Sequence, residues 1–163
     1  FWGEPLADIA ARMAAVRAAA PAGRNPAFSV SVRPITGKTE QEAWEKAHHY
    51  LERVVAHKGQ APGSAPASGS QRLLDRAREQ EVFDDRLWLA ISAATGAPGN
   101  TSCLVGTPEQ VAESILRYHD LGVGSILIRG FEPLEDVREW GHDLIPLIRE
   151  GAATRARATR AAD

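Results

Sequence analysis

Several features that would assign a function directly are scarce or absent in this sequence. One cysteine, Cys103, stands among 163 residues, which excludes an internal disulfide and a zinc site made of several cysteines. Lys and Arg (19) nearly balance Asp and Glu (21), so the net charge of -2 creates no long-range field that would attract nucleic acid or an anionic membrane. No apolar run approaches the roughly 20 residues that cross a bilayer, and no phosphate-binding GxGxxG or GKS/GKT motif occurs. We therefore expect a cytoplasmic protein without a metal site and without nucleic-acid or membrane partners.

The clearest pattern that is present is a helix, a strand and a second helix within residues 104–149. Thr107, Pro108 and Gln110 occupy the N-cap, N1 and N3 positions of a capping box, which predicts a helix start. The buried face of this helix should carry Val111, Ile115 and Tyr118. A glycine in Leu121-Gly122 then predicts the end of the helix.

The next two elements follow with little between them. Residues 125–129 are short and β-branched, as expected for a strand, and Gly130 ends them. Pro133 opens a second helix. Its expected apolar stripe consists of Leu134, Val137, Gly141, Leu144 and Ile148.

The upstream part repeats this alternation. A helix should begin at Glu4-Pro5 and end near Pro21, with Phe1-Trp2 as the end of an earlier strand. Residues 28–33 alternate between apolar and polar side chains, which is typical of a strand. A second capping box at Thr39 and Glu42 predicts a helix that ends near residues 57–59.

Two turn-rich segments interrupt the remaining stretch. Gln60 to Ser70 is rich in Ala, Pro, Gly and Ser, and we expect a mobile loop there. Thr95 to Asn100 should be a second flexible segment. Between them, Leu73 to Ile91 has a helical pattern that is broken at Asp84-Asp85.

Two strands about 90 residues apart, each followed by a helix, favour an α/β fold of the (β/α)8 barrel type. Two strands cannot close a barrel, so we expect the chain, which opens on Phe1 in the middle of a pattern, to be the C-terminal part of a longer protein. Residues 1–150 would form this portion of one barrel domain, and residues 151–163 an Ala/Arg-rich tail.

Four segments resemble the bacterial luciferase-like flavin monooxygenases, and among them the alkanesulfonate monooxygenase branch. The segments are WGEP (2–5), TEQEAW (39–44), LVGTPEQVAE (104–113) and RGFEPLEDV (129–137) with its following LIPLIR. The resemblance implies a luciferase-like TIM barrel and reduced FMN (FMNH2) supplied by a separate flavin reductase. It also implies O2 insertion into a small organosulfur compound such as an alkanesulfonate or dimethyl sulfone, and a homo-oligomeric full-length form.

The chain departs from this branch at four positions. Where the family carries an active-site Arg and, two residues later, a His, this chain has Ser31 and Arg33. The Arg of the family's mobile loop falls near Thr95-Gly96, where no Arg occurs, and an active-site Tyr aligns with Phe131. These differences concern the substrate more than the fold or the flavin.

The residues themselves suggest where a site would lie. Side chains of a barrel strand alternate between the helix layer and the lumen, so Ser31 and Arg33 should face the lumen while their apolar neighbours pack under helices. Arg129 ends the last strand, on the face where barrel enzymes place their active sites. Arginines there favour an anionic ligand, unless each pairs with a lumen carboxylate. Ser31, Arg33 and Arg129 are therefore the catalytic candidates. Trp2 and Phe131 are the cofactor-binding candidates, since each could wall a flavin pocket or simply belong to the core.

Three functions stay open. The first is an FMNH2-dependent monooxygenase of the luciferase-like class, of which these 163 residues by themselves would be inactive. The second uses the deazaflavin F420 for hydride transfer on the same fold. The third is a non-catalytic barrel remnant that acts through oligomerisation by its apolar helix faces.

Overall fold

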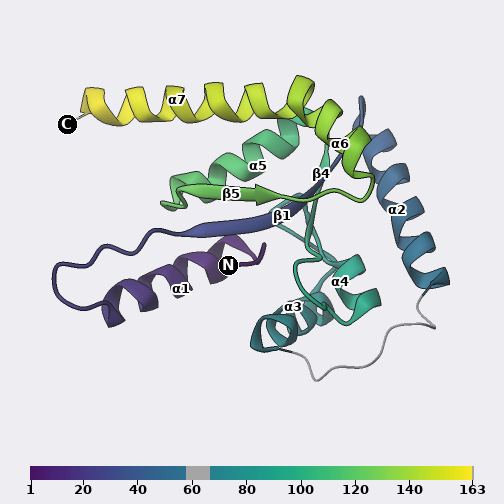
Figure 1. Cartoon of the computed structure of the whole chain (residues 1–163), viewed down its shortest axis with the longest axis horizontal. Helices are drawn as coiled ribbons and strands as arrows, with labels where there is room; N and C mark the ends of the chain where they lie inside the picture. The colour runs from purple at the N-terminus through teal and green to yellow at the C-terminus, as the bar shows by residue number, and fades with distance from the viewer. Residues whose placement is uncertain (58–66, 163) are drawn as a thin grey trace.

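The computed structural model describes residues 1–57 and 67–162, which form a mixed sheet with helices packed around it (Figure 1). The strands are β1 (Ser29–Thr36), β2 (Val82–Phe83), β3 (Leu87–Trp88), β4 (Cys103–Gly106) and β5 (Ser125–Ile128), in the spatial order β2-β3-β4-β1-β5. The helices are α1 (Leu6–Ala19), α2 (Glu40–Ala56), α3 (Ser68–Glu79), α4 (Ala90–Thr95), α5 (Pro108–Asp120), α6 (Pro133–Glu139) and α7 (Ile145–Ala162). A π-helical turn, η2 (Trp140–Leu144), joins the last two.

Strand β1 is the longest strand and pairs with a parallel neighbour on each side. Its first half pairs in parallel with β5, from Ser29 opposite Ser125, and its second half pairs in parallel with β4, from Arg33 opposite Cys103. A parallel bridge joins Trp2 to Ser31, so Phe1-Trp2 runs alongside β1 in the direction expected of a neighbouring parallel strand. The result is an open segment of a parallel β/α sheet, as the predicted partial barrel requires.

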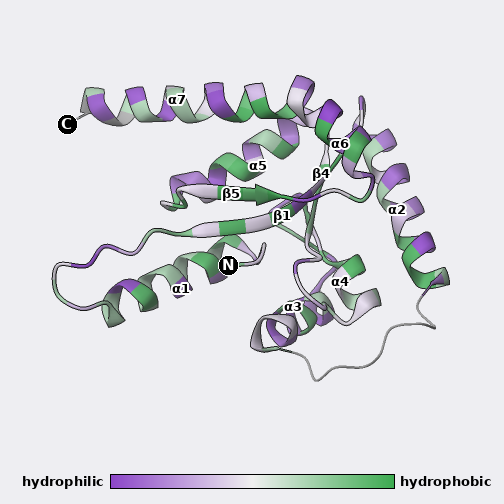
Figure 2. Ribbon diagram, viewed as in Figure 1, coloured by the Kyte–Doolittle hydropathy of each residue, from purple (hydrophilic) through white to green (hydrophobic). Residues whose placement is uncertain are grey.

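The alternation predicted for β1 is confirmed by burial. Val30 and Val32 are fully buried under helices, whereas Ser31 and Arg33 on the opposite face are only partly buried. The apolar side of β1 packs against Ile9 of α1 and Ile115 of α5 in the main core. Figure 2 shows the same apolar character along β1, β5 and α5. One face of β1 thus contributes to the core, and the other face is polar and partly open to solvent.

Local start and stop signals were predicted well. The α5 helix has both hydrogen bonds of the capping box between Thr107 and Gln110, and Gly122 has a φ of 98° just after the helix ends. At the start of α2, Thr39 accepts from the Glu42 amide, but the Glu42 carboxylate accepts from Lys38 N instead of Thr39 N. The second capping box is therefore only half formed.

Strand β4 was missed by the sequence analysis, which expected two strands in all. All four of its residues are buried, so Cys103–Gly106 shows no polar alternation to indicate a strand. Its pairing with β1 brings a third parallel strand into the sheet.

The helical pattern predicted for Leu73 to Ile91, broken at Asp84-Asp85, holds up to Glu79 in α3 and again from Ala90 in α4, but it was wrong for the residues between them. The chain forms the antiparallel hairpin β2-β3 there, and it turns at Asp84 and Asp85, whose φ angles are 49° and 69°. The expected mobile loop also ends earlier than predicted, because Ser68, Gly69 and Ser70 belong to α3. Residues 60–66 of that loop lie outside the described residues.

The stripe predicted after Pro133 was wrong at its beginning. Leu134 and Val137 are 57% and 64% exposed, whereas Asp136, Trp140 and Leu144 are buried. The buried Asp136 carboxylate holds the preceding loop, so α6 turns a polar residue inward, and the π-helical turn then changes the register of the following helix.

The predicted Ala/Arg-rich tail continues α7 without a break at residue 150. Gly151 packs closely on Leu116, and Arg155 donates to Glu113 and Asp120, so the helix is fastened to α5 beyond that position. Among the described residues, no helix combines the length and the apolar character needed to cross a membrane.

Candidate functional site

An open basin of about 560 Å³ lies on the polar face of β1. Three of the five residues singled out in the sequence line it, namely Trp2, Ser31 and Arg129. Its lining also includes residues that sequence reasoning did not select: Arg12, Arg72 and Asn100. These side chains come from α1, α3, the loop before β4 and the two neighbouring strands β1 and β5. The basin is therefore a product of tertiary packing.

Ser31 lies at the floor of the basin in a chain of hydrogen bonds. Asn100 Nδ2 donates to Ser31 Oγ at 2.8 Å, and Ser102 Oγ donates to Asn100 Oδ1 at 2.9 Å. Asn100 is 5% exposed and Ser102 is fully buried, so this chain is rigidly held. Because an amide nitrogen can only donate, Ser31 Oγ accepts from Asn100 and its own proton is free to point toward a ligand.

Arg33 lies beside the basin but directs its guanidinium at backbone carbonyl groups. Its Nε donates to the Asn100 carbonyl at 3.0 Å and its Nη1 to the Gly130 carbonyl at 2.8 Å. Burial lowers the pKa of Arg33 below its ordinary value, and the positive charge of Arg129 acts in the same direction. Arg33 thus ties together the two loops that border the basin.

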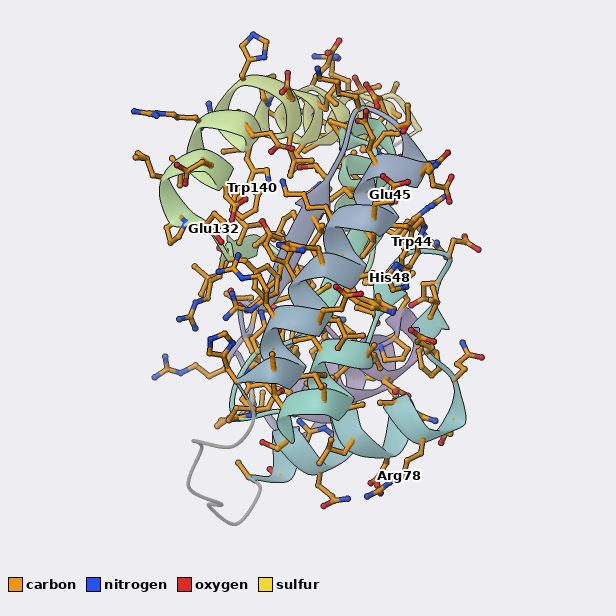
Figure 3. The ribbon with its side chains drawn as sticks, turned by 90° about the vertical axis from the view of Figure 1, so that its right-hand side faces the viewer. Trp44, Glu45, His48, Arg78, Glu132 and Trp140 are labelled. Carbon is orange, nitrogen blue, oxygen red and sulfur yellow. The ribbon has the colours of Figure 1, made fainter. Side chains whose placement is uncertain are left out.

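Phe131 faces away from the basin. Its ring stacks on the ring of Tyr50 of α2, with 4.5 Å between the centroids and an angle of 23° between the planes. The guanidinium carbon of Arg33 lies 5.0 Å from the centroid of the Phe131 ring. Next to it, Arg53 of α2 donates to Glu132 at 2.5 Å, so helix α2 holds the loop after β5. Figure 3 labels Glu132 on this loop and Trp44, Glu45 and His48 on α2. Phe131 lines a small neighbouring pocket of about 290 Å³ with Tyr50 and Arg53.

Trp2 forms part of the basin wall, as expected for an aromatic residue that could contact a planar ligand. Its indole packs against Gly69 near the start of α3, where an added Cβ would lie 2.9 Å from the Trp2 ring. Only a glycine fits at this position, so the approach of α3 to Trp2 depends on it.

Arg129 has the most available charge in the basin. It is exposed, and within residues 1–57 and 67–162 its side chain has no hydrogen-bond or ion-pair partner. The register that places Val32 opposite Ile128 brings Arg33 and Arg129 to adjacent positions. The two arginines are therefore neighbours, but only Arg129 lines the basin.

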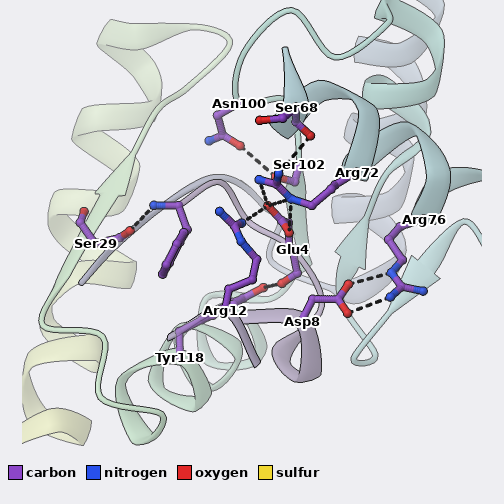
Figure 4. Close-up of polar contacts among 11 residues, drawn as sticks. Glu4, Asp8, Arg12, Ser29, Ser68, Arg72, Arg76, Asn100, Ser102 and Tyr118 are labelled. Atoms are coloured by element: carbon purple, nitrogen blue, oxygen red, sulfur yellow. Dashed lines mark hydrogen bonds and ion pairs between the residues drawn. The ribbon is translucent and has the colours of Figure 1, made fainter. Parts of the chain in front are cut away.

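The buried carboxylate of Glu4 binds Arg12 and Arg72, two of the arginines that line the basin (Figure 4). Glu4 is 1% exposed, and it accepts from Arg12 Nη1 at 2.5 Å and from Arg72 Nε and Nη2 at 3.2 to 3.3 Å. Tyr118 Oη donates to the Glu4 carbonyl at 2.8 Å. Nothing in the sequence indicated this cluster, because Arg72 is 68 residues away from Glu4. They meet only because α3 lies beside the start of α1, where Arg76 of α3 also donates to Asp8 of α1.

A larger pocket, of about 810 Å³, lies elsewhere, at the carboxyl ends of β1 and β4. Its lining contains Lys38 and Lys46, but four carboxylates accompany them. Lys46 already contacts Glu139 at 3.1 Å and the Thr36 carbonyl at 3.4 Å. This pocket therefore offers little uncompensated positive charge, and none of the five candidates lines it.

The only cysteine in the sequence is not a reactive group. Cys103 is fully buried in β4, and burial raises the pKa of its thiol to about 12. A thiol that stays protonated is a poor nucleophile.

The chain belongs to the luciferase-like monooxygenase family, since a sequence profile of that family matches residues 1–125. The predicted family and fold class are thereby confirmed. Among solved structures, the chain is similar to riboflavin lyase (RcaE), determined with modified FMN and the substrate riboflavin, with a TM-score of 0.62 and 21% identity over 92% of this chain and 38% of that one. It is also similar to EDTA monooxygenase (EmoA) from Chelativorans sp. BNC1, with a TM-score of 0.52 and 19% identity over 91% of this chain and 41% of that one.

The chain spans well under half of the length of these two enzymes. At identities near one fifth, the similarity to them concerns the fold.

Proposed function

We propose that this chain contributes one wall of the active site of a flavin-dependent monooxygenase that uses FMNH2 and O2. The observation that carries the proposal is the basin over β1, where Trp2, Ser31 and Arg129 come together in a member of the luciferase-like family. Because this chain would form only part of a barrel, the basin is open on one side, and further barrel strands would complete the site there.

The lining suits a flavin ring. Trp2 offers a flat apolar surface, and Ser31, fixed by Asn100, offers a hydroxyl donor for a ring carbonyl. Arg129 can balance negative charge on a reduced ring or on a bound substrate. Phe131 would act indirectly, by holding Arg33 and the loop after β5.

The reduced flavin supplies the two electrons that activate O2, so that one oxygen atom enters the substrate and the other leaves as water. The residues of this chain would bind and orient the substrate, exclude water and place a donor at Ser31. A separate flavin reductase would deliver the FMNH2, and the complete enzyme would be a homo-oligomer in the cytoplasm.

For the substrate, we propose a small organosulfur compound such as an alkanesulfonate or dimethyl sulfone. The resemblance of the four sequence segments supports this class. Ser31, Arg33 and Phe131 differ from the alkanesulfonate branch, so within this class dimethyl sulfone fits as well as an alkanesulfonate.

The test is an oxygen-dependent turnover assay with chemically reduced FMN and a panel of alkanesulfonates, dimethyl sulfone and unrelated amines and carboxylates. It should be made on the protein that contains this chain within its full barrel. Product that requires both FMNH2 and O2 is expected, and Ser31→Ala should reduce its rate by about tenfold or more. Absence of any FMNH2-dependent oxidation across the panel would contradict the proposal.

The F420-dependent alternative makes a different prediction in the same assay. Hydride transfer to or from F420 would proceed without O2 and would change the absorbance of the deazaflavin. A non-catalytic barrel remnant would bind neither reduced FMN nor F420.

A further inference from the structure

The charge around the basin is more specific than its shape. Three guanidinium groups line it, those of Arg12, Arg72 and Arg129, and within the described part of the chain no carboxylate belongs to its lining. Glu4 lies behind two of them and is 1% exposed, so one negative charge is set against three positive ones. Arg12 and Arg72 also border a neighbouring pocket that contains Asp8, Asp75 and Glu79, but those three carboxylates are paired with Arg76 and Arg78. On the basin side, positive charge is therefore in excess.

The two arginines on Glu4 are fixed in place and yet accessible. The side chains of Arg12 and Arg72 are 30% and 38% exposed while the carboxylate beneath them is inaccessible. Arg12 also lies over the Phe1 ring, with its guanidinium carbon 4.3 Å from the centroid. Arg72 is held further by a bond from Nη1 to the Ser68 carbonyl at 3.0 Å. Guanidinium groups held in this way lose little entropy when they bind an oxyanion.

Arg129 approaches the same space from β5, on the other side of Ser31. It has no competing partner among the described residues, so its donors are available to a ligand. Ser31 and Asn100 form the polar floor between these arginines. An oxyanion in the basin would thus meet charge from two sides and a hydroxyl donor from below.

The geometry points to a doubly charged oxyanion, such as a phosphate group or a pair of carboxylates, as the group that Arg12, Arg72 and Arg129 bind. This inference rests on the proposed function, because it takes the basin as part of the active site. What it adds is that the ligand carries two negative charges. The anion could be the phosphate of the flavin or an anionic group on the substrate, because both share this chemistry. If the substrate is neutral, as dimethyl sulfone is, the anion that these arginines bind would be the flavin phosphate.

The test uses the protein that contains this chain within its full barrel, together with three variants of it. Titration calorimetry at low salt measures how tightly each protein binds inorganic pyrophosphate. Arg129→Gln is the main variant, because its side chain holds no other residue and its loss leaves the fold intact. Arg12→Gln is the second, and melting curves check its stability. Arg138→Gln, an exposed arginine of α6 outside the basin, is the matched control for the loss of one positive charge.

Arg129→Gln and Arg12→Gln should each weaken pyrophosphate binding by about tenfold or more, and Arg138→Gln by less than about twofold. Equal affinities in the wild type and in Arg129→Gln, or an equal loss in Arg138→Gln, would overturn the inference.

Two further arms separate the sources of the anion. If Arg129→Gln weakens FMN but not riboflavin, the site holds the flavin phosphate. If both flavins are unaffected and pyrophosphate competes with the substrate in turnover, the site holds the substrate. An enzyme that turns over with FMNH2 but shows no arginine-dependent anion binding would leave the proposed function standing and remove this inference alone.

Discussion

The guanidinium group of Arg33 lies over the ring of Phe131, 5.0 Å from its centroid. Sequence reasoning assigned these two residues separate roles, one catalytic and one in cofactor binding. In the structure they contact each other, and Arg33 also bonds to the Asn100 and Gly130 carbonyl groups. The pair therefore acts as a clamp on the loops around the basin.

This clamp predicts that the two neighbouring arginines respond differently to truncation. Arg33→Ala should lower the free energy of unfolding by about 2 to 3 kcal/mol, because two partly buried carbonyl groups lose a charged donor. Arg129→Ala should change it by less than about 0.5 kcal/mol, since an exposed side chain without partners is removed. Urea unfolding of both variants measures this difference. A stable Arg33→Ala protein with impaired ligand binding would instead return Arg33 to the role of a direct ligand contact.

The site could be predicted from the sequence only in part, and the reason is physical. Strand alternation places Ser31 and Arg33 on the polar face of β1, and this local rule succeeded. Strand alternation does not determine where the guanidinium group at the end of a long side chain lies. The guanidinium group of Arg33 donates to the backbone carbonyl groups of residues 100 and 130. Arg12 and Arg72 were missed because their meeting depends on the contact between α1 and α3.

The Glu4 cluster predicts a large stability effect for one buried carboxylate. Glu4→Gln should lower the free energy of unfolding by about 2 to 4 kcal/mol, because an amide cannot satisfy two guanidinium groups; partial solvent exposure of the arginines limits the loss. Glu45→Gln, on the exposed face of α2, is the control and should stay within about 0.5 kcal/mol. Thermal unfolding at neutral pH compares the two. Equal effects would mean that the cluster contributes no net stability.

Close packing at Gly130 predicts an asymmetry between two glycines. A Cβ on Gly130 would lie 2.0 Å from Asp136 Oδ2, the atom that accepts from the Phe131 and Glu132 amides at 2.8 and 2.9 Å. Gly130→Ala should therefore break these bonds and cost about 2 to 4 kcal/mol of stability.

Gly141 offers the control for this substitution. A Cβ there meets no atom within 4 Å, so Gly141→Ala should be neutral or stabilising by up to about 1 kcal/mol. Denaturant midpoints of the two variants provide the measurement. Similar midpoints would show that the loop adapts to a side chain at residue 130.

The fold was predicted best where its signals are local. The Thr107 capping box and Gly122 lie within one turn of the helix ends that they define, and both were confirmed. Strand β4 was missed because four buried residues have no polar alternation, and its identity as a strand depends on pairing with β1. The break predicted at Asp84-Asp85 is present as a turn with positive φ angles, which aspartate adopts more readily than most residues, but the hairpin on either side of it was not predicted.

The open edge of the sheet predicts association of the 163-residue chain on its own. Strand β5 is the last strand in the sheet, its Leu127 is 54% exposed, and Ile126, Ile128 and Ile148 line an open apolar groove of about 520 Å³. Unpaired strand edges and apolar grooves both promote self-association. Light scattering after gel filtration should find dimers or larger species, and Leu127→Lys should shift them toward monomer. A monomeric chain that binds FMN tightly would contradict the idea of an incomplete barrel.

Buried phenol and thiol groups predict that the protein loses stability in alkaline solution. Burial raises the pKa of Tyr50 from 10.0 to about 12 and that of Cys103 from 9.0 to about 12, and burial also raises the pKa of Tyr118. The native protein therefore keeps protons that the unfolded chain has released. The stabilising contribution is complete below about pH 9 and is lost as the pH rises to about 12, at about 1.4 kcal/mol per pH unit for each group.

Urea unfolding at pH values between about 8 and 11 should show this decline, and tyrosinate absorbance should appear together with unfolding instead of before it. Tyr50→Phe removes one of the titrating groups, and the decline above pH 10 should then be shallower by about 1.4 kcal/mol per pH unit. The phenol of Tyr50 stacks on Phe131, so the variant keeps the ring contact while it loses only the hydroxyl. An unchanged slope in Tyr50→Phe would mean that Tyr50 ionises freely in the native protein, and that helix α2 does not seal the clamp of Arg33 and Phe131 from solvent.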